Sequence, residues 1–286
     1  MAGILVVHGI GQQLEGPSTL GARLFPALRD GLLRAGTDLN RDDVSFASYG
    51  EFFRPAAEFL APEPYYEDSD VEAGYETDLL MALWGRAAGC DQAVVPPEEE
   101  TLGRTPSAAC HALAAMSRSR FLAGVAERLF IGDLKQVRAY FCDEGLRAAI
   151  QERVAAAMAA DTRVVVAHSL GSVVAYELLF THPHPQLGAL VTLGSPLGMR
   201  NLIFDRLRPA PAATGDGRVM GAWPPVRMWA NVADSGDVVA AVEDLRPLFG
   251  DGIRQLRVHN GPQAHDMSSY LTDPLTGQLI AAGLDA

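Results

Sequence analysis

Residues 164–171 read Val-Val-Val-Ala-His-Ser-Leu-Gly, and this stretch says more about the fold than any other part of the chain. The apolar, β-branched run at 164–166 is typical of a buried strand. Residues 172–180, Ser-Val-Val-Ala-Tyr-Glu-Leu-Leu-Phe, follow at once and have a helical pattern. The stretch therefore predicts a strand, a sharp turn and a helix, with Ser169 at the apex of the turn.

The turn around Ser169 fits the nucleophile-elbow pattern small-x-Ser-x-Gly, with Ala167 and Gly171 in the two small positions. Small residues are needed because the serine adopts a strained conformation and the chain passes close to itself. This geometry lifts the Ser169 hydroxyl clear of the sheet. It also aims the backbone N–H of Leu170 at the place where an oxyanion would form. The alternative is an ordinary strand-to-helix turn, in which serine and glycine are common.

The N-terminal segment supplies a second part of such a site. Residues 3–7, Gly-Ile-Leu-Val-Val, are apolar without alternation, which is typical of a strand buried on both faces of a parallel sheet. The following His8-Gly9-Ile10-Gly11 resembles the oxyanion loop of α/β-hydrolases, in which the N–H of the residue after His-Gly, here Ile10, is the second donor. The alternative is a phosphate-binding turn, but Leu14 stands where a dinucleotide fingerprint has its third glycine.

Further strand-like runs occur at intervals, with helical patterns between them. The expected strands are residues 3–7, 44–49, 163–166, 189–193, 226–230 and 253–258. Alternating strands and helices of this kind predict the α/β class, with a mostly parallel sheet flanked by helices. The strands then end at one edge of the sheet, where open α/β sheets bind their ligands.

Residues 52–132 do not follow this rhythm. They are rich in proline and acidic residues, with helical patches at 77–88 and 107–130. We expect a helical insertion between the second and third strands that caps the ligand-binding edge of a single domain, residues 1–286. The alternative is a group of peripheral helices with no role at the site. Residues 133–158 have apolar positions at helical spacing and predict one helix before the third strand.

Two carboxylates follow the fifth expected strand, in Trp229-Ala-Asn-Val-Ala-Asp234-Ser-Gly-Asp237-Val-Val-Ala240. A serine nucleophile needs a general base, and the base needs a carboxylate to orient it. Here the chain resembles the lipase and serine-esterase branch of the α/β-hydrolase family, whose acid is followed by x-Val-Pro/Ala. The resemblance gives the acid role to Asp237. Asp234 is the alternative, and a turn or a helix cap would also explain either aspartate.

The loop after the last expected strand contains two histidines, His259 at the strand end and His265 further on. The resemblance favours His265 as the base, because the family's histidine is commonly followed a few residues later by an aromatic-Leu pair, here Tyr270-Leu271. His259 is the alternative, and a surface position would explain either histidine. After the fourth expected strand, Gly194-Ser195-Pro196 resembles a segment that many such esterases carry, and it could line the pocket rim.

The net charge of −12 argues against a nucleic-acid partner, because nucleic-acid binding depends on basic patches. No run of about 18 apolar residues is present, so we expect no transmembrane segment. Met1 leads directly into the first expected strand, without the features of a signal peptide. The three widely spaced cysteines, Cys90, Cys110 and Cys142, fit a reducing compartment. These features together predict a cytoplasmic protein.

The resemblance covers almost the whole chain and matches least in residues 52–132. It departs from the family pattern at Ala167, and two early strands of the full fold are missing, which implies a trimmed α/β-hydrolase fold. The alternative is a non-catalytic member that uses this fold as a binding scaffold.

The resemblance implies a serine hydrolase. Ser169 would attack an acyl carbonyl, His265 would accept its proton, and Asp237 would orient the imidazole ring. Ile10 and Leu170 would donate their backbone N–H groups to the oxyanion. No metal or organic cofactor is needed. We expect cleavage of a carboxylic ester of a small-molecule or lipid-like acyl substrate. The same triad could instead cleave an amide, peptide or thioester, or transfer the acyl group to a nucleophile other than water.

Overall fold

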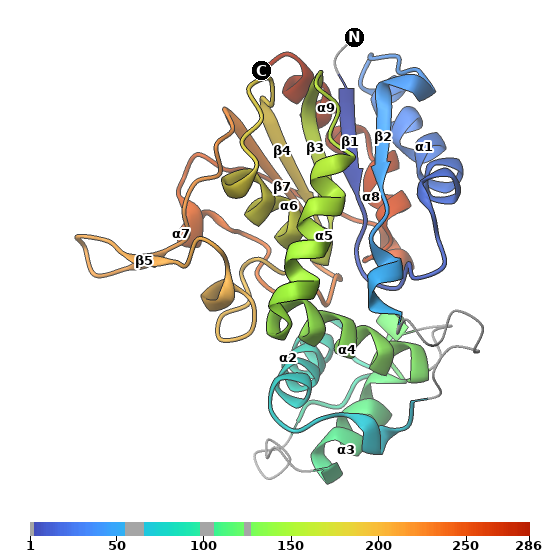
Figure 1. The fold of residues 1–286 in the computed structure, drawn as a ribbon. Helices are drawn as coiled ribbons and strands as arrows, with labels where there is room; N and C mark the ends of the chain where they lie inside the picture. The colour runs from blue at the N-terminus through green and yellow to red at the C-terminus, as the bar shows by residue number, and fades with distance from the viewer. Residues whose placement is uncertain (1–2, 55–65, 98–105, 123–126) are drawn as a thin grey trace.

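The centre of the molecule is a six-stranded sheet with the order β2-β1-β3-β4-β7-β8, in which every pairing is parallel (Figure 1). A computed structural model describes residues 3–54, 66–97, 106–122 and 127–286. The strands are β1 (Gly3–Val7), β2 (Val44–Ala47), β3 (Thr162–His168), β4 (Ala189–Leu193), β7 (Met228–Asp234) and β8 (Arg254–Val258). The predicted α/β class is confirmed, and each of the six expected strands forms within a few residues of its predicted bounds.

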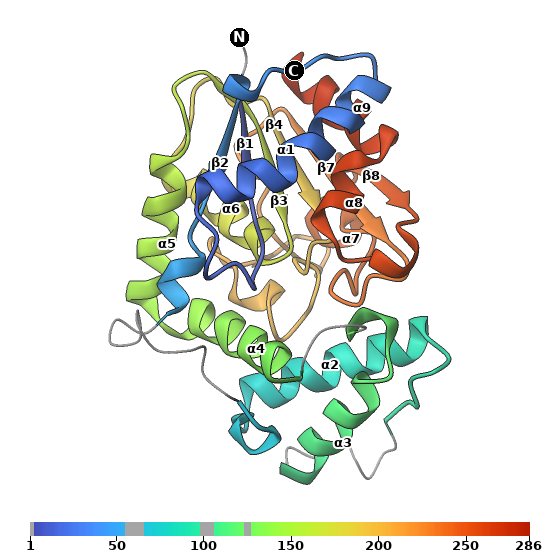
Figure 2. The same cartoon turned by 90° about the vertical axis from the view of Figure 1, so that its right-hand side faces the viewer.

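Helices cover both faces of the sheet (Figures 1 and 2). One face packs against α1 (Pro17–Arg34), α8 (Met267–Thr272) and α9 (Pro274–Leu284), and the other against α5 (Glu144–Ala156) and α6 (Leu170–Thr181). The short helix α7 (Arg246–Phe249) and a small antiparallel hairpin, β5 (Ala212–Ala213) and β6 (Val219–Met220), lie in the C-terminal half of the chain.

The apolar runs of the strands serve two cores at once. Val164 and Val166 of β3 belong to the core that includes Leu24 of α1, whereas Val165 belongs to the core that includes Val173 of α6. Successive side chains of a strand point to opposite faces, so a strand between two helical layers must be apolar at every position. This is why the sequence of β3 shows no alternation of apolar and polar residues.

The order of the strands locates a crevice. From β1 the chain continues to β2 on one side, and from β3 it continues to β4 on the other side, although β1 and β3 are neighbours. Such a reversal between adjacent parallel strands leaves a crevice at their carboxyl ends, where ligands of open α/β sheets bind. The residues that follow β1 and β3 are His8-Gly9-Ile10 and Ser169, which therefore meet at this crevice.

The segment between β2 and β3 contains α2 (Tyr75–Cys90), α3 (Pro106–Met116), α4 (Glu127–Cys142) and α5. Figures 1 and 2 show α2, α3 and α4 grouped at the end of the molecule where the strands end. The helical patch predicted at 77–88 lies within α2. Residues 55–65, 98–105 and 123–126 of the predicted insertion lie outside the described residues. The described residues also form short 3-10 helices: Arg41–Asp43, Gly50–Phe53, Asp68–Asp70, Arg120–Leu122, Phe204–Arg206 and Gly261–Gln263.

Two predicted helices are interrupted in the structure. The patch predicted at 107–130 ends as α3 at Met116, because the Ser119 hydroxyl donates to the Met116 carbonyl at 2.6 Å and accepts from the Leu122 N–H at 3.2 Å. The prediction of a single helix at 133–158 is wrong. This segment is divided between α4 and α5 because Asp143 leaves the helical conformation and caps α5, accepting a hydrogen bond from the N–H of Leu146 at 2.9 Å.

In the portion of the chain that the structure describes, no helix combines the length and the apolar character that crossing a membrane requires.

Candidate active site

Ser169 occupies the turn between β3 and α6 in a strained backbone conformation. Its φ is 53° and its ψ is −130°, a region that residues with a side chain rarely adopt. Its backbone N–H donates to the carbonyl of Leu193 at 3.0 Å, which ties the turn to β4. A methyl group on Gly171 would clash with the carbonyl oxygen of His8 and lie 2.8 Å from that of Val7. The close approach expected from the small residue after the serine is therefore present.

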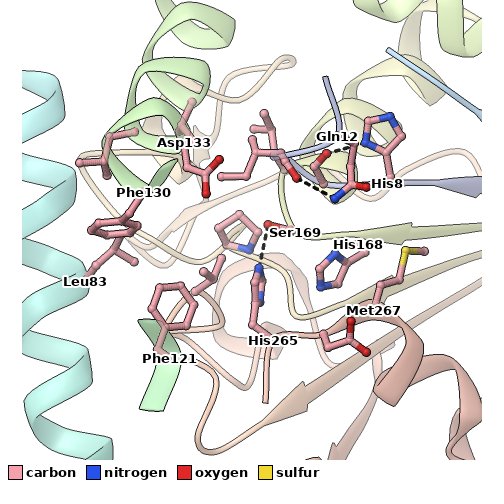
Figure 3. Close-up of a pocket in the computed structure, with 18 of the residues that line it drawn as sticks. His8, Gln12, Leu83, Phe121, Phe130, Asp133, His168, Ser169, His265 and Met267 are labelled. Carbon is pink, nitrogen blue, oxygen red and sulfur yellow. Dashed lines mark hydrogen bonds between the residues drawn. The ribbon is translucent and has the colours of Figure 1, made fainter. Parts of the chain in front are cut away.

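Ser169, His265 and Asp237 form a hydrogen-bonded chain. The Nε2 atom of His265 lies 3.1 Å from the Ser169 hydroxyl oxygen, and its Nδ1 atom lies 2.8 Å from Oδ2 of Asp237. Figure 3 shows the imidazole ring of His265 pointing at Ser169. Ser169 follows β3, Asp237 follows β7 and His265 follows β8, so the three side chains meet at the carboxyl edge of the sheet.

The Asp237 carboxylate is completely buried, and hydrogen-bond donors surround it. Oδ2 accepts from the Tyr270 hydroxyl at 2.8 Å, and Oδ1 accepts from the backbone N–H groups of Val239 at 2.9 Å and Ala240 at 3.3 Å. Burial alone would raise the pKa of Asp237, but the His265 ring and the hydrogen bonds from His265 and Tyr270 hold it below its usual value. Asp237 is therefore ionised at neutral pH.

These contacts decide where the protons lie. The Tyr270 hydroxyl accepts from the Asp234 backbone N–H at 2.9 Å, so its own proton points to Asp237. The ionised Asp237 can only accept, so Nδ1 of His265 must carry the proton of the neutral ring. The Nε2 atom of His265 is then free to accept a hydrogen bond from the Ser169 hydroxyl, which is the arrangement a general base requires.

Asp234 has a different set of contacts. Its carboxylate accepts from the backbone N–H of Gly236 at 2.7 Å and from that of Asn260. It therefore holds the turn after β7 and the loop after β8 together. His259 is exposed and lines a neighbouring pocket that does not include Ser169. Of the alternatives left by the sequence, the structure brings Asp237 and His265 to the serine, and not Asp234 or His259.

The two expected oxyanion donors lie beside Ser169. Ile10, Leu170 and Ser169 line the same pocket. Gly9 packs so closely on the serine that a methyl group on it would lie 2.7 Å from the Ser169 Cβ atom. The structure shows no hydrogen bond from the backbone N–H of Ile10 or Leu170 to any other described atom, so both groups can donate to a ligand.

His8 orients one of these donors. Its Nε2 atom accepts from the backbone N–H of Tyr49 at 3.1 Å, so Nδ1 carries the proton and donates to the carbonyl of Gly9. Burial lowers the pKa of His8 to about 4, which keeps the ring neutral in this tautomer. The Gly9 carbonyl and the Ile10 N–H belong to one planar trans peptide and point to opposite sides. A fixed carbonyl therefore fixes the direction of the Ile10 N–H.

Sequence reasoning missed the roles of three residues at this site. The hydrogen bonds of His8 and of the Tyr270 hydroxyl were not expected, although both residues belong to motifs that the sequence shows. The third is Gly194, which has a φ of 52° and lies so close to these side chains that a methyl group on it would be 2.6 Å from Oδ2 of Asp237 and 3.2 Å from Nδ1 of His265. A glycine at the end of an expected strand was the available signal.

His168, next to the serine, also lies against His265. The two imidazole rings have their centroids 4.6 Å apart. Burial, together with the nearby His265, lowers the pKa of His168 to about 3, so it is uncharged and does not repel a proton that His265 accepts. The Gly194-Ser195-Pro196 segment reaches the pocket through Pro196, which lines it as expected for a rim.

The pocket that contains Ser169 has a volume of about 220 Å³ and a mostly apolar wall (Figure 3). Much of the wall comes from the segment between β2 and β3: Leu79 and Leu83 of α2, Phe121, and Phe130, Leu134 and Val137 of α4. Gln12, Arg23 and Asp133 add polar groups. The pocket could therefore hold an apolar group beside Ser169.

No group of histidine, cysteine or carboxylate side chains suited to a metal ion occurs within the described ranges. In comparisons with known proteins, no protein-family model matches the chain and no similar curated protein is found.

Proposed function

We propose that this protein is a serine hydrolase that cleaves a carboxylic ester through an acyl-enzyme intermediate on Ser169. One observation carries the proposal: a serine held at a strained strand-to-helix turn is hydrogen-bonded to a histidine, which is hydrogen-bonded in turn to a buried aspartate whose pKa is lowered. Nucleophile, base and orienting carboxylate are the three groups that activation of a serine requires.

The reaction follows from these contacts. The Ser169 oxygen attacks the carbonyl carbon of the ester while Nε2 of His265 takes the hydroxyl proton. The imidazolium ion that forms is stabilised by Asp237, and it then protonates the oxygen of the departing alcohol. A water molecule, deprotonated by the same histidine, attacks the acyl-enzyme and releases the acid. Each proton removed from a nucleophile is returned to a leaving group, so the enzyme is regenerated.

The backbone N–H groups of Ile10 and Leu170 stabilise the oxyanion in this proposal. The Leu170 N–H also lies at the N-terminus of α6, where the helix dipole favours negative charge. In other enzymes, the removal of one such donor costs roughly 3–4 kcal/mol of transition-state stabilisation.

We propose a trimmed α/β-hydrolase fold in which the insertion at residues 52–132 caps the site. The support is that described residues of α2, of α4 and around Phe121 line the pocket that contains Ser169. An apolar cap would exclude water and favour an apolar acyl group. The expectation of a small-molecule or lipid-like acyl substrate agrees with this lining.

The test uses a fluorophosphonate probe, which reacts covalently with an activated serine. We expect labelling of the wild type and loss of labelling in Ser169→Ala, in which hydrolysis of p-nitrophenyl esters should fall below a few per cent. The matched control is Ser195→Ala, because Ser195 is also buried just after a strand, but its hydroxyl oxygen accepts from the backbone N–H of Leu197 and forms no hydrogen bond with a histidine among the described residues. Labelling of Ser169→Ala equal to that of the wild type would overturn the proposal.

The same assay separates the reaction classes that share this triad. We expect p-nitrophenyl esters of rising chain length to be cleaved faster than matched amides and thioesters. Faster cleavage of an amide or thioester would leave Ser169 as the nucleophile and would replace the ester in the proposal.

A further inference from the structure

A second pocket of about 660 Å³ adjoins the pocket that contains Ser169. The two pockets share Phe121, Phe130, Asp133, His265 and Asp266. Ser169, Ile10 and Leu170 line only the first pocket, which is the smaller one. His265 is thus the triad member that faces both spaces, whereas the nucleophile and the oxyanion donors face one of them.

This division separates the two halves of an ester. The acyl carbon bonds to Ser169 and its oxygen must reach Ile10 and Leu170, so the acyl group lies in the first pocket. The departing alcohol must take a proton from His265, so its oxygen lies within reach of that ring. The rest of the alcohol needs no contact with Ser169. We infer that the second pocket is the leaving-group site and that it selects polar alcohols, cationic ones over anionic ones. This inference rests on the proposed function.

The lining of the second pocket supports the chemistry. Polar side chains are more frequent in it than in the first pocket, and they include Ser119, Ser235, His259 and Gln263. Its volume, three times that of the first pocket, accommodates an alcohol bulkier than the acyl group. A polar alcohol can exchange its hydrogen bonds with water for hydrogen bonds with such a wall, whereas an alkyl chain cannot.

The charge of the lining distinguishes cations from anions. Among the described residues, four carboxylates line the second pocket, those of Asp91, Asp133, Asp234 and Asp266, against one guanidinium, that of Arg120. The Nε atom of Arg120 lies 3.7 Å from Oδ2 of Asp91, so the charge of this arginine is largely offset. Hydrogen bonds from the backbone N–H groups of Arg120 and Ala93 lower the pKa of Asp91 and keep it ionised. The remaining negative field attracts a cation and repels an anion.

Phe121 stands between the two pockets. It lines both, its ring centroid lies 5.9 Å from that of His265, and it meets the ring of Phe130 edge-on at 6.2 Å. Figure 3 shows Phe121 beside His265 and Phe130. Because its ring lines both pockets, Phe121 is an apolar divider between them. The divider keeps the apolar acyl space separate from the acidic space for the alcohol.

The experiment compares butyrate esters that differ only in the alcohol. Butyrylcholine carries a trimethylammonium group, its neutral isostere has a tert-butyl group in that place, and the butyrate ester of isethionate carries a sulfonate. Titration of the released butyric acid measures all three. We expect kcat/KM for the cation to exceed that for the isostere by about fivefold or more, with the anion slowest. High salt should reduce the preference.

A pair of variants links this preference to the pocket. Asp133→Asn removes one negative charge from the lining and keeps an oxygen that can accept from Gln136, which now lies 3.3 Å from Oδ1. We expect it to lower the cation-to-anion ratio of kcat/KM by about fivefold. Asp30→Asn makes the same change in net charge at an exposed position on α1, outside both pockets, and should leave the ratio unchanged.

The outcomes separate this inference from the proposed function. The protein could be labelled by the fluorophosphonate and cleave the esters without preferring the cation, or Asp133→Asn could leave the cation-to-anion ratio of kcat/KM unchanged. Either result would overturn the leaving-group site and retain the serine hydrolase. Labelling without cleavage of any of the three esters would also overturn the site. If the fluorophosphonate does not label the wild type, the proposed function itself is overturned.

Discussion

Asp234 is the last residue of β7 and Asp237 follows it three residues later; both are buried, yet they contact different partners. Asp237 accepts hydrogen bonds from His265 and Tyr270, whereas Asp234 accepts only backbone N–H groups. A carboxylate beside the imidazole fixes its tautomer, and one that binds backbone fixes a loop. Two residues of the same type therefore have different contacts, and only Asp237 is placed for the proposed reaction.

If the proposed function holds, Asp237→Asn should lower kcat by about 10⁴-fold, as the equivalent change does in a known serine hydrolase, because the amide can donate to Nδ1 and stabilise the wrong tautomer. Asp234→Asn keeps an acceptor for Gly236 and Asn260 and should cost less than about tenfold. Steady-state kinetics with a p-nitrophenyl ester measures both, and thermal unfolding verifies that both variants fold. A larger loss of activity in Asp234→Asn would show that Asp237 is not the orienting acid.

At the scale of the element, the N-terminus of α6 is held against the end of β1. Gly171 is the residue at which the two backbones approach, since the carbonyl oxygens of Val7 and His8 occupy the space a side chain would need. The packing of one glycine thereby sets the position of the Leu170 N–H relative to the Ile10 N–H. A helix that shifted by a fraction of an ångström would separate the two proposed oxyanion donors.

Gly171→Ala should destabilise the protein by about 1–3 kcal/mol and reduce kcat with it, because the added methyl group forces α6 away from β1. Chemical unfolding and ester kinetics measure the two effects. Gly85→Ala is the matched control, since Gly85 is exposed within α2 and has open space around its Cα atom. It should stabilise the protein by up to about 1 kcal/mol. Equal stability of the two variants would exclude the close approach.

At the scale of the whole molecule, a buried ion pair joins α4, α5 and α6 to the loop that contains Arg208. Glu177 of α6 accepts from Arg147 of α5 and from the Tyr140 hydroxyl of α4 at 2.7 Å, and it also accepts from the backbone N–H of Arg208 at 3.0 Å. Both charged side chains are almost fully buried. Four separate parts of the chain thus depend on one carboxylate.

Glu177→Gln should reduce the free energy of unfolding by about 3–5 kcal/mol, because the Arg147 guanidinium would stay buried without a counter-charge. Denaturant unfolding measures the change. Glu144→Gln removes an exposed partner of Arg208 and should have no measurable effect. A Glu177→Gln variant as stable as Glu144→Gln would contradict this account of the network.

Two buried histidines predict how the stability of the molecule depends on pH. The folded-state pKa of His8 is about 4 and that of His168 about 3, below the value of about 6.5 for an unfolded chain. Below pH 6.5 the unfolded state therefore binds more protons, and stability falls as the pH falls towards these folded-state values. Each group contributes a slope of up to about 1.4 kcal/mol per pH unit.

Denaturant unfolding at a series of pH values between 7 and 4 measures this slope. In His168→Gln we expect the change of the unfolding free energy with pH to become less steep, by the equivalent of about one proton taken up on unfolding. The reason is that the glutamine side chain cannot be protonated in the unfolded state. An unchanged slope would mean that His168 is not held neutral by burial.

Short-range patterns were sufficient for much of this protein. The uninterrupted apolar runs at residues 3–7 and 164–166 predicted strands of a parallel sheet, because a strand buried on both faces is apolar at successive positions. The small residues around Ser169 predicted the strained turn, since the requirement for them is local. The helices at 107–130 and 133–158 were less well predicted, because the side-chain hydrogen bonds of Ser119 and the capping by Asp143 override a continuous apolar pattern.

Other features depended on residues that are far apart in the sequence. Ser169 and His265 are separated by 96 residues, and the choice between His259 and His265 depended on the course of a loop after the last strand. Contacts between distant residues also decide the choice of Asp237 over Asp234, the hydrogen bond from Tyr270 and the lining of the second pocket. Sequence patterns report which face of an element is buried, whereas the tertiary structure decides which side chains meet at the edge of the sheet, because those meetings depend on how separate elements pack.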